Sequence, residues 1–150
     1  MEIQCAKRED LQEILQLQHL AFRTEAARYN DYAIQPLLQT LDELEREFMQ
    51  GPVLKALKDC RIIGSVRASI RENTLCIGKL MVHPAYRGQG IGRKLLLTME
   101  AFHPHHRYEL FTSERSIENL SMYESMGYVR FKQRCMDGIN FIFLKKEALA

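Results

Sequence analysis

A glycine-rich turn is the part of this sequence whose residue types and spacing best suit chemistry. Glycine occurs there at three alternate positions, Gly88, Gly90 and Gly92. Glycine adopts backbone conformations closed to other residues and has no Cβ atom to block a ligand. The basic neighbours are Arg87, Arg93 and Lys94. If a helix begins at this turn, its free amides and dipole form an anion site suited to a pyrophosphate.

The spacing of these glycines separates the turn from the standard nucleotide-binding motifs. The dinucleotide pattern would need a further glycine at Arg93, and no Gly-Lys-Ser/Thr triplet follows. These differences argue against a dehydrogenase and a P-loop protein. The alternative interpretation is a tight turn from a strand to a helix with no ligand.

The surrounding pattern predicts the elements that position this turn. Apolar alternation and short apolar runs predict strands over residues 1–7, 53–58, 62–70, 74–82, 108–112, 128–136 and 139–145. Capping boxes at Asp10/Glu13 and Thr40/Glu43 predict helices over 11–22 and 41–50. The helical spacing of apolar residues predicts two more helices over 90–102 and 117–126. Residues 23–39 show no clean period, which suggests a structured loop or a broken helix.

This order of elements predicts an α/β (α+β) fold in one domain spanning residues 1–150. With 46% apolar and 27% charged residues, the chain has the composition of a folded globular protein. Its 21 basic and 19 acidic residues leave a net charge of +2, which gives no reason to expect nucleic-acid or membrane binding. The N-terminus is charged where a signal peptide would be apolar, and the four cysteines are too widely spaced for a disulfide framework. Neither feature is typical of an exported protein, so we expect a cytoplasmic one.

Two motifs make the chain resemble a known family. Val82-x-Pro84 followed by Arg87-x-x-Gly90-x-Gly92 resembles the acyl-CoA pyrophosphate motif of the GNAT acetyltransferase superfamily. Downstream, Asn119-x-x-x-Tyr123 closed by Gly127-Tyr128 resembles the family's second motif. The resemblance covers nearly the whole chain. It implies a mixed, mostly antiparallel sheet of six to seven strands flanked by about four helices in three layers, α/β/α.

The resemblance also implies acetyl-CoA (coenzyme A) as co-substrate and no metal. The main chain of Leu80, Met81 and Val82 would bind the pantetheine arm, although their side chains suit a plain core strand. The pyrophosphate would be held by Arg87, Gly88, Gln89, Gly90, Ile91, Gly92 and Arg93. Asn119 often bonds to the cofactor in this family, with a polar surface position as the alternative.

Tyr123 resembles the family tyrosine that protonates the departing thiolate, which a phenol can do as charge develops on sulfur. Without the motif, an aromatic residue filling the core would be the better interpretation. The base that deprotonates the acceptor amine is not identified by the sequence. Candidates for the base or for acceptor binding are Glu25, Tyr29, Asp31 and Glu114, each with a solvated surface position as its alternative.

Histidines are not assigned a role in this interpretation. His83 precedes a proline at the end of a strand and is expected to be part of the turn. His103, His105 and His106 lack partners at metal-ligand spacing, which favours a solvated connection.

The sequence therefore predicts direct transfer of an acetyl (acyl) group from acetyl-CoA to a primary amine of a small molecule or peptide. A catalytically inactive CoA-binding regulatory module is the alternative, and a nucleic-acid-binding domain is the weakest. The acceptor, the acyl-chain preference, the general base and the oligomeric state stay open. Related proteins often pair through their C-terminal strands, so the apolar run 139–144 suggests a homodimer.

Overall fold

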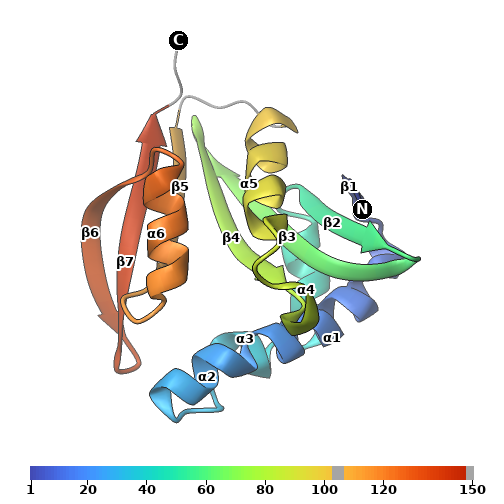
Figure 1. Cartoon of the computed structure of the whole chain (residues 1–150), viewed down its shortest axis with the longest axis horizontal. Helices are drawn as coiled ribbons and strands as arrows, with labels where there is room; N and C mark the ends of the chain where they lie inside the picture. Colours follow the sequence, from blue (N-terminus) through green and yellow to red (C-terminus); the bar gives the residue numbers. More distant parts are fainter. Residues whose placement is uncertain (103–106, 148–150) are drawn as a thin grey trace.

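Seven strands form one sheet in a computed structural model that describes residues 1–102 and 107–147 (Figure 1). The strand order is β1-β2-β3-β4-β5-β7-β6. The strands are β1 (Glu2–Cys5), β2 (Val53–Lys58), β3 (Arg61–Arg71), β4 (Thr74–Val82), β5 (Arg107–Ser113), β6 (Val129–Met136) and β7 (Ile139–Glu147). All neighbours pair antiparallel except β4 and β5, which pair parallel. The predicted mixed, mostly antiparallel sheet is confirmed.

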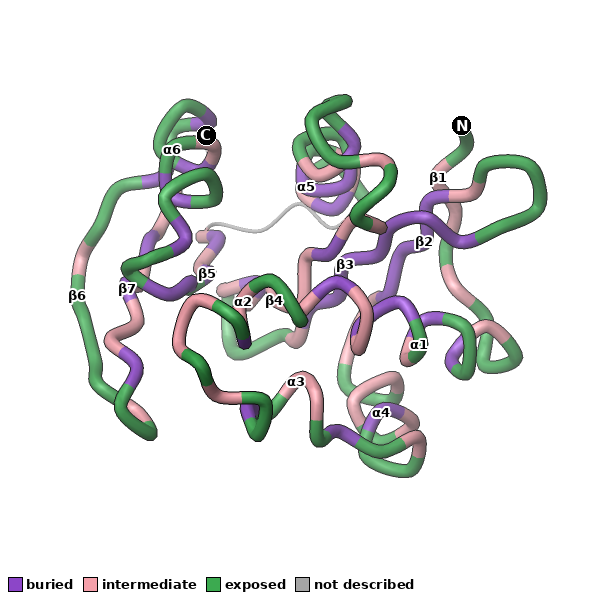
Figure 2. Tube along the Cα trace, turned by 60° about the horizontal axis from the view of Figure 1, so that its bottom comes forward, coloured by how far each residue is buried: buried purple, intermediate pink, exposed green. Residues whose placement is uncertain are grey.

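Helices cover both faces of this sheet. The α-helices are α1 (Leu11–Ala21), α2 (Arg23–Tyr29), α3 (Gln35–Leu38), α4 (Leu41–Phe48), α5 (Ile91–Phe102) and α6 (Ile117–Ser125), and the 3-10 turns are η1 (Arg8–Asp10) and η2 (Pro84–Tyr86). Figures 1 and 2 show α5 and α6 on one face and α1 to α4 on the other. This is the expected three-layer arrangement, with the segment 23–39 forming a broken helix.

A separate apolar core fills each side of the sheet. On the α5 side, Leu95, Leu96 and Met99 are fully buried against strand residues such as Leu54 and Leu75. On the other side, buried side chains of α1 and α4 pack against the sheet, and they are Leu11, Ile14, Leu17, Ala21 and Leu44. Burial of apolar surface is the main favourable contribution to folding, so both helical layers stabilise the sheet.

One of the two predicted capping boxes is correct. Thr40 Oγ1 accepts from the Glu43 amide at 3.3 Å, and Glu43 Oε1 accepts from the Thr40 amide at 3.0 Å. The box at Asp10 and Glu13 is wrong, because Asp10 makes no side-chain cap bond to α1. Its carboxylate instead binds the Lys55 ammonium at 2.7 Å, and Glu13 accepts from the Ile62 amide at 2.8 Å. Asp10 also accepts from the Lys7 amide at 2.7 Å, so it caps η1 and contacts the sheet in place of the predicted box with Glu13.

The C-terminal strand lies inside the sheet and not at its edge. β7 pairs with β5 on one side and with β6 on the other. Residues 139–144 therefore have no free strand edge for pairing with a second copy, so the homodimer suggested by this run has no support from its position. The edge strand on this side of the sheet is β6, which is exposed along most of its length in Figure 2.

Candidate functional site

The two parallel strands at the centre of the sheet separate soon after they begin. β4 pairs with β5 only through Thr74–Arg107, Leu75–Tyr108 and Cys76–Glu109. Beyond Cys76, β4 continues to Val82 with no strand partner on that side, and Figure 1 shows the two strands diverging. Backbone N–H and C=O groups need partners, so this edge of β4 can hydrogen-bond an extended ligand.

A bulge shapes β4 where it leaves β5. Lys79 has a left-handed φ of 51°, and the register with β3 shifts between Ser65 and Arg67. After the bulge, the Met81 side chain is buried in the core on the α1 side. Leu80 and Val82 pack against the α5-side core. All three residues predicted to offer main-chain bonds lie on the unpaired stretch of β4.

The glycine turn connects β4 to α5, as the sequence predicts. His83 Nδ1 accepts from the Ala85 amide at 3.0 Å, which caps η2 and places this histidine in the turn. Gly88 and Gly90 have φ of 78° and 79°, in the left-handed region that favours glycine. Gly88, Gln89 and Gly90 are exposed, and α5 begins at Ile91. The first amides of a helix have no intrahelical partner, so they can bind an anion here.

Two arginines of the turn already contact other elements. Arg87 donates from Nη1 to Thr24 Oγ1 at 2.7 Å and from Nη2 to Ala21 O at 2.8 Å. Arg93 donates from Nη2 to Ser125 Oγ at 2.6 Å. Arg87 thus joins the turn to the N-terminal helices, and Arg93 joins α5 to α6. Both side chains position the turn as well as bringing positive charge to it.

Helix α6 brings Tyr123 to the space opened between β4 and β5. Tyr123 is 5% exposed, and its hydroxyl has no hydrogen-bond partner within residues 1–102 and 107–147. Burial raises the pKa of its phenol well above the ordinary value, so the hydroxyl stays protonated and can donate. Asn119 lies one helical turn earlier and is exposed. Both residues line the same cleft.

The Gly127-Tyr128 pair fixes the end of α6. The Tyr128 amide donates to Tyr123 O at 3.1 Å, and Gly127 has a left-handed φ of 97°. The Tyr128 hydroxyl donates to Glu100 Oε2 at 2.6 Å, and Lys146 donates to Glu100 Oε1 at 2.9 Å. This network ties α6 to α5 and β7, and it thereby sets where Tyr123 lies.

A cleft of about 680 Å³ runs from the gap between β4 and β5 toward α2, α3 and α4. Of the residues predicted from the sequence, those that line it are Leu80, Tyr123, Asn119, Glu25 and Asp31. Glu25 accepts from Ser116 Oγ through both carboxylate oxygens, at 2.9 and 2.8 Å. Asp31 Oδ1 accepts from the Ala33 amide at 2.9 Å.

Two other predicted acceptor residues do not line the cleft. The Tyr29 hydroxyl bonds to Ser113 Oγ, and the Arg115 guanidinium lies 4.5 Å from the centre of its ring. Glu114 Oε2 accepts from Asn140 Nδ2 at 2.9 Å. The face of the Tyr29 ring, a predicted acceptor-binding residue, is therefore covered by Arg115.

Arg67, Lys79 and Ser116 line the cleft and were missed by sequence reasoning. Arg67 is 5% exposed in the middle of β3, and Lys79 forms the bulge of β4. The signal available for both was a basic residue inside a run that otherwise reads as a buried strand. Ser116 is 1% exposed and precedes α6.

No group of three or more His, Cys, Asp or Glu suited to a metal ion occurs in the described part of the chain. His103, His105 and His106 lie outside the described residues. The cysteines Cys5, Cys60, Cys76 and Cys135 are free. None of the helices within the described ranges has the length and apolar content needed to cross a membrane.

Solved structures with the same fold include several acetyltransferases. The paia N-acetyltransferase from Thermoplasma acidophilum, solved with coenzyme A, is 21% identical with a TM-score of 0.78, covering 99% of this chain and 100% of that chain. The ribosomal-protein-S18-alanine N-acetyltransferase from Escherichia coli is 15% identical with a TM-score of 0.81, covering 99% and 95%. A Salmonella typhimurium structure with its cofactor acetyl-CoA is 20% identical with a TM-score of 0.75, covering 98% and 93%.

The family assignment comes from the sequence match to a family model. No curated protein showed a significant sequence match. The model described as an acetyltransferase (GNAT) domain matches residues 50–130, which is more than half of the chain and includes β4, the glycine turn and α6. The protein therefore belongs to the GNAT acetyltransferase family.

Proposed function

We propose that this protein transfers an acetyl group from acetyl-CoA to a primary amine in a ternary complex. The observation that carries the proposal is the unpaired edge of β4 beside the protonated hydroxyl of Tyr123. The pantetheine arm would lie along Leu80 to Val82, and the pyrophosphate would lie over the first amides of α5. The coenzyme A bound in the Thermoplasma acidophilum structure supports this choice of cofactor.

The reaction is a direct substitution at the thioester carbonyl. The amine nitrogen attacks the carbonyl carbon, the new C–N bond forms, and the C–S bond breaks. Backbone amides near Met81 and Val82 would polarise the carbonyl oxygen. Tyr123 gives its proton to the departing thiolate, and the amine loses its proton to a base. Because both reactants are held in one cleft, the amine attacks the thioester without the entropic cost of a bimolecular encounter.

Glu25 is the stronger of the two base candidates that line the cleft. Its carboxylate is fixed by Ser116 just before α6, the helix that carries Tyr123. Asp31 belongs to an exposed turn instead. Glu25→Gln would keep the hydrogen bond from Ser116 while removing the base, and turnover at saturating acceptor would report its role.

Calorimetric titration with acetyl-CoA tests the cofactor site. We expect micromolar binding by the wild type and a loss of about tenfold or more in Gly90→Glu, because a carboxylate would face the phosphates. Gly138→Glu is the matched control, since Gly138 also has a φ of 78° with open space at Cβ but lies in the β6–β7 hairpin. Equal affinities in the two variants would reject the site.

An assay of thiol release over a panel of amines separates the enzyme from a regulatory module. The enzyme releases coenzyme A faster in the presence of at least one amine. Tight binding of acetyl-CoA with no release on any amine would favour the inactive module, which the retained Tyr123 argues against.

A further inference from the structure

Among the described residues, one guanidinium nitrogen of Arg67 has no hydrogen-bond partner. Its Nε donates to Glu47 Oε2 at 2.6 Å, and its Nη2 donates to the side-chain oxygens of Gln18 and Gln39 at 3.0 and 2.8 Å. The Nη1 atom is buried and has no hydrogen-bond partner among the described residues. Buried donors are nearly always paired in native proteins. Because Arg67 lines the cleft, an oxygen of a ligand bound there would be a partner for this donor.

Lys79 adds a second positive charge next to Arg67. Within the described ranges the Lys79 ammonium makes no hydrogen bond or salt bridge. Burial lowers the pKa of its ammonium, and so does the charge of Arg67, whereas Glu47 raises it. One carboxylate therefore faces two cations at this end of the cleft. Glu109, which also lines the cleft, is paired with Arg71 and Arg107.

There is room beside these cations for a small anion. Gly78 pairs with Arg67 across the β3–β4 ladder, so both residues face the same side of the sheet. A Cβ atom added at Gly78 would meet nothing within 4 Å. The absent side chain leaves open space next to Arg67, and Gly78 itself lines the cleft.

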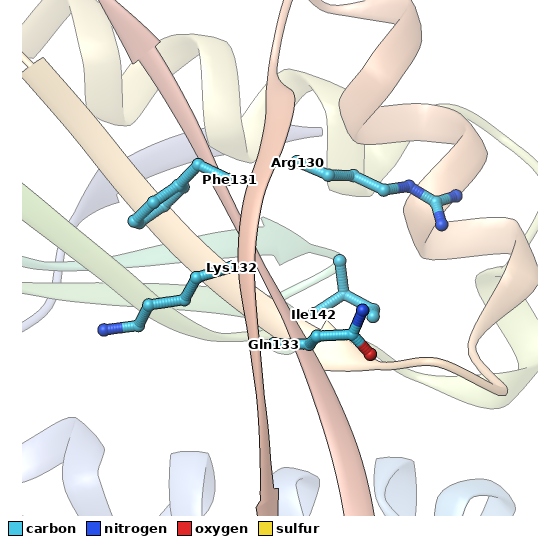
Figure 3. Close-up of a pocket in the computed structure, with 5 residues that line it drawn as sticks. All are labelled: Arg130, Phe131, Lys132, Gln133 and Ile142. Atoms are coloured by element: carbon cyan, nitrogen blue, oxygen red, sulfur yellow. The ribbon is translucent and has the colours of Figure 1, made fainter.

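Phe111, Phe141 and Phe143, on β5 and β7, form an aromatic wall of the same cleft. The ring centres of Phe111 and Phe143 lie 5.1 Å apart, and those of Phe111 and Phe141 lie 5.5 Å apart. Phe111 is 49% exposed although it belongs to a central strand. Lys132 lies 4.7 Å from the centre of the Phe143 ring, and Figure 3 shows its side chain on the opposite side of β6 from Arg130. This wall suits an apolar body.

We infer that the acceptor is an amino acid with an apolar or aromatic side chain, whose carboxylate binds Arg67 and Lys79. A carboxylate oxygen would satisfy Arg67 Nη1, and its charge would balance Lys79. The side chain would pack on Phe111, Phe141 and Phe143. The inference rests on the proposed function, since it names the acceptor for the same cleft.

The test compares acceptors that differ only in the carboxylate. L-phenylalanine and L-phenylalaninamide are each titrated into the wild-type protein saturated with coenzyme A, after acetyl-CoA binding has been measured in the same instrument. We expect L-phenylalanine to bind at least tenfold more tightly. Equal affinities, or no binding of either compound by protein that binds acetyl-CoA, would overturn the inference and leave the proposed function standing. Absence of acetyl-CoA binding would remove both.

Variants of the cleft residues test whether the preference for L-phenylalanine over its amide comes from Lys79. Lys79→Met keeps the length of the side chain without its charge and should reduce the preference for L-phenylalanine over the amide about tenfold. Lys145→Met is the control, since Lys145 lies on β7 and does not line the cleft. Gly78→Leu should fill the space beside Arg67 and weaken the binding of both compounds. An unchanged preference in Lys79→Met would refute the assignment of the carboxylate to this corner. Arg67 is left intact because it holds three other side chains.

Discussion

Arg87 donates a hydrogen bond of 2.7 Å to the hydroxyl of Thr24, a residue 63 positions earlier in the chain. Its second bond reaches the carbonyl oxygen of Ala21 at 2.8 Å. The turn before α5 is thereby held against the junction of α1 and α2. Glu25, which lines the acceptor end of the cleft, is the neighbour of Thr24. Arg87 therefore connects the turn to α2, the helix that carries Glu25.

Variants of Arg87 and of its partner Thr24 should distinguish the effect of the Arg87 charge on acetyl-CoA binding from the effect of its hydrogen bonds. Arg87→Met removes a cation from the turn as well as both bonds, so we expect acetyl-CoA to bind about tenfold more weakly, equivalent to about 1.4 kcal/mol. Thr24→Val removes one bond and keeps the charge, so its affinity should stay within about twofold. Titration calorimetry checks both. Wild-type affinity in Arg87→Met would show that its charge does not reach the cofactor.

Tyr123→Phe should lower turnover and leave the cofactor site intact. Loss of a general acid typically reduces the rate by about a hundredfold or more, whereas acetyl-CoA affinity should stay within about twofold. Steady-state kinetics and calorimetry on one preparation give both values. A variant that turns over at the wild-type rate would remove Tyr123 from the chemistry.

The pH dependence of turnover offers a second check on Tyr123. Burial raises the pKa of this phenol above its ordinary value. The acid form is therefore kept as the pH rises, so wild-type turnover should not fall through ionisation of Tyr123 below about pH 10. A descending limb below that pH in the wild type that is absent from Tyr123→Phe would contradict this assignment.

The glycines of the turn should differ in their tolerance of alanine. Gly90→Ala places a Cβ atom on a residue with φ of 79°, which costs about 1–2 kcal/mol. At Gly92 an added Cβ meets Val82, Leu80 and Met122 only at ordinary contact distances of 3.7 to 3.9 Å. Gly92→Ala should therefore change the free energy of unfolding by less than about 0.5 kcal/mol. Urea denaturation compares the two, and equal losses would contradict the backbone explanation.

Asp10 should make the protein sensitive to acid. Burial by itself would raise its pKa, but hydrogen bonds from the Lys55 ammonium and the Lys7 amide hold the pKa below the ordinary value. A lowered pKa contributes stability that is present above about pH 4 and is lost as the pH falls through the folded-state value. The slope of unfolding free energy against pH below 4 should be shallower in Asp10→Asn. An identical slope would mean that other carboxyl groups control acid unfolding.

Much of the fold could be predicted because its signals are local. Apolar alternation or a short apolar run indicated each strand of the sheet, and the spacing of Ile91, Leu95 and Met99 indicated the buried face of α5. The capping box at Thr40 could also be predicted, because its two partners, Thr40 and Glu43, are three residues apart. The predicted box at Asp10 failed for the opposite reason. The Asp10 carboxylate binds Lys55, which is 45 positions away, as well as the nearby Lys7 amide, and Glu13 binds the Ile62 amide instead.

The sequence by itself determined the order of the elements, the glycine turn and the helix that carries Tyr123, since each depends on residues that are neighbours in the chain. Only the tertiary structure decided which cations share the cleft. Arg67 and Lys79 come from different strands, and their placement follows from the β3–β4 register and the bulge at Lys79. Likewise, the Arg115 guanidinium packs on the Tyr29 ring, and β6 pairs with the edge of β7 that β5 leaves open. Such contacts join distant segments, so no local pattern specifies them.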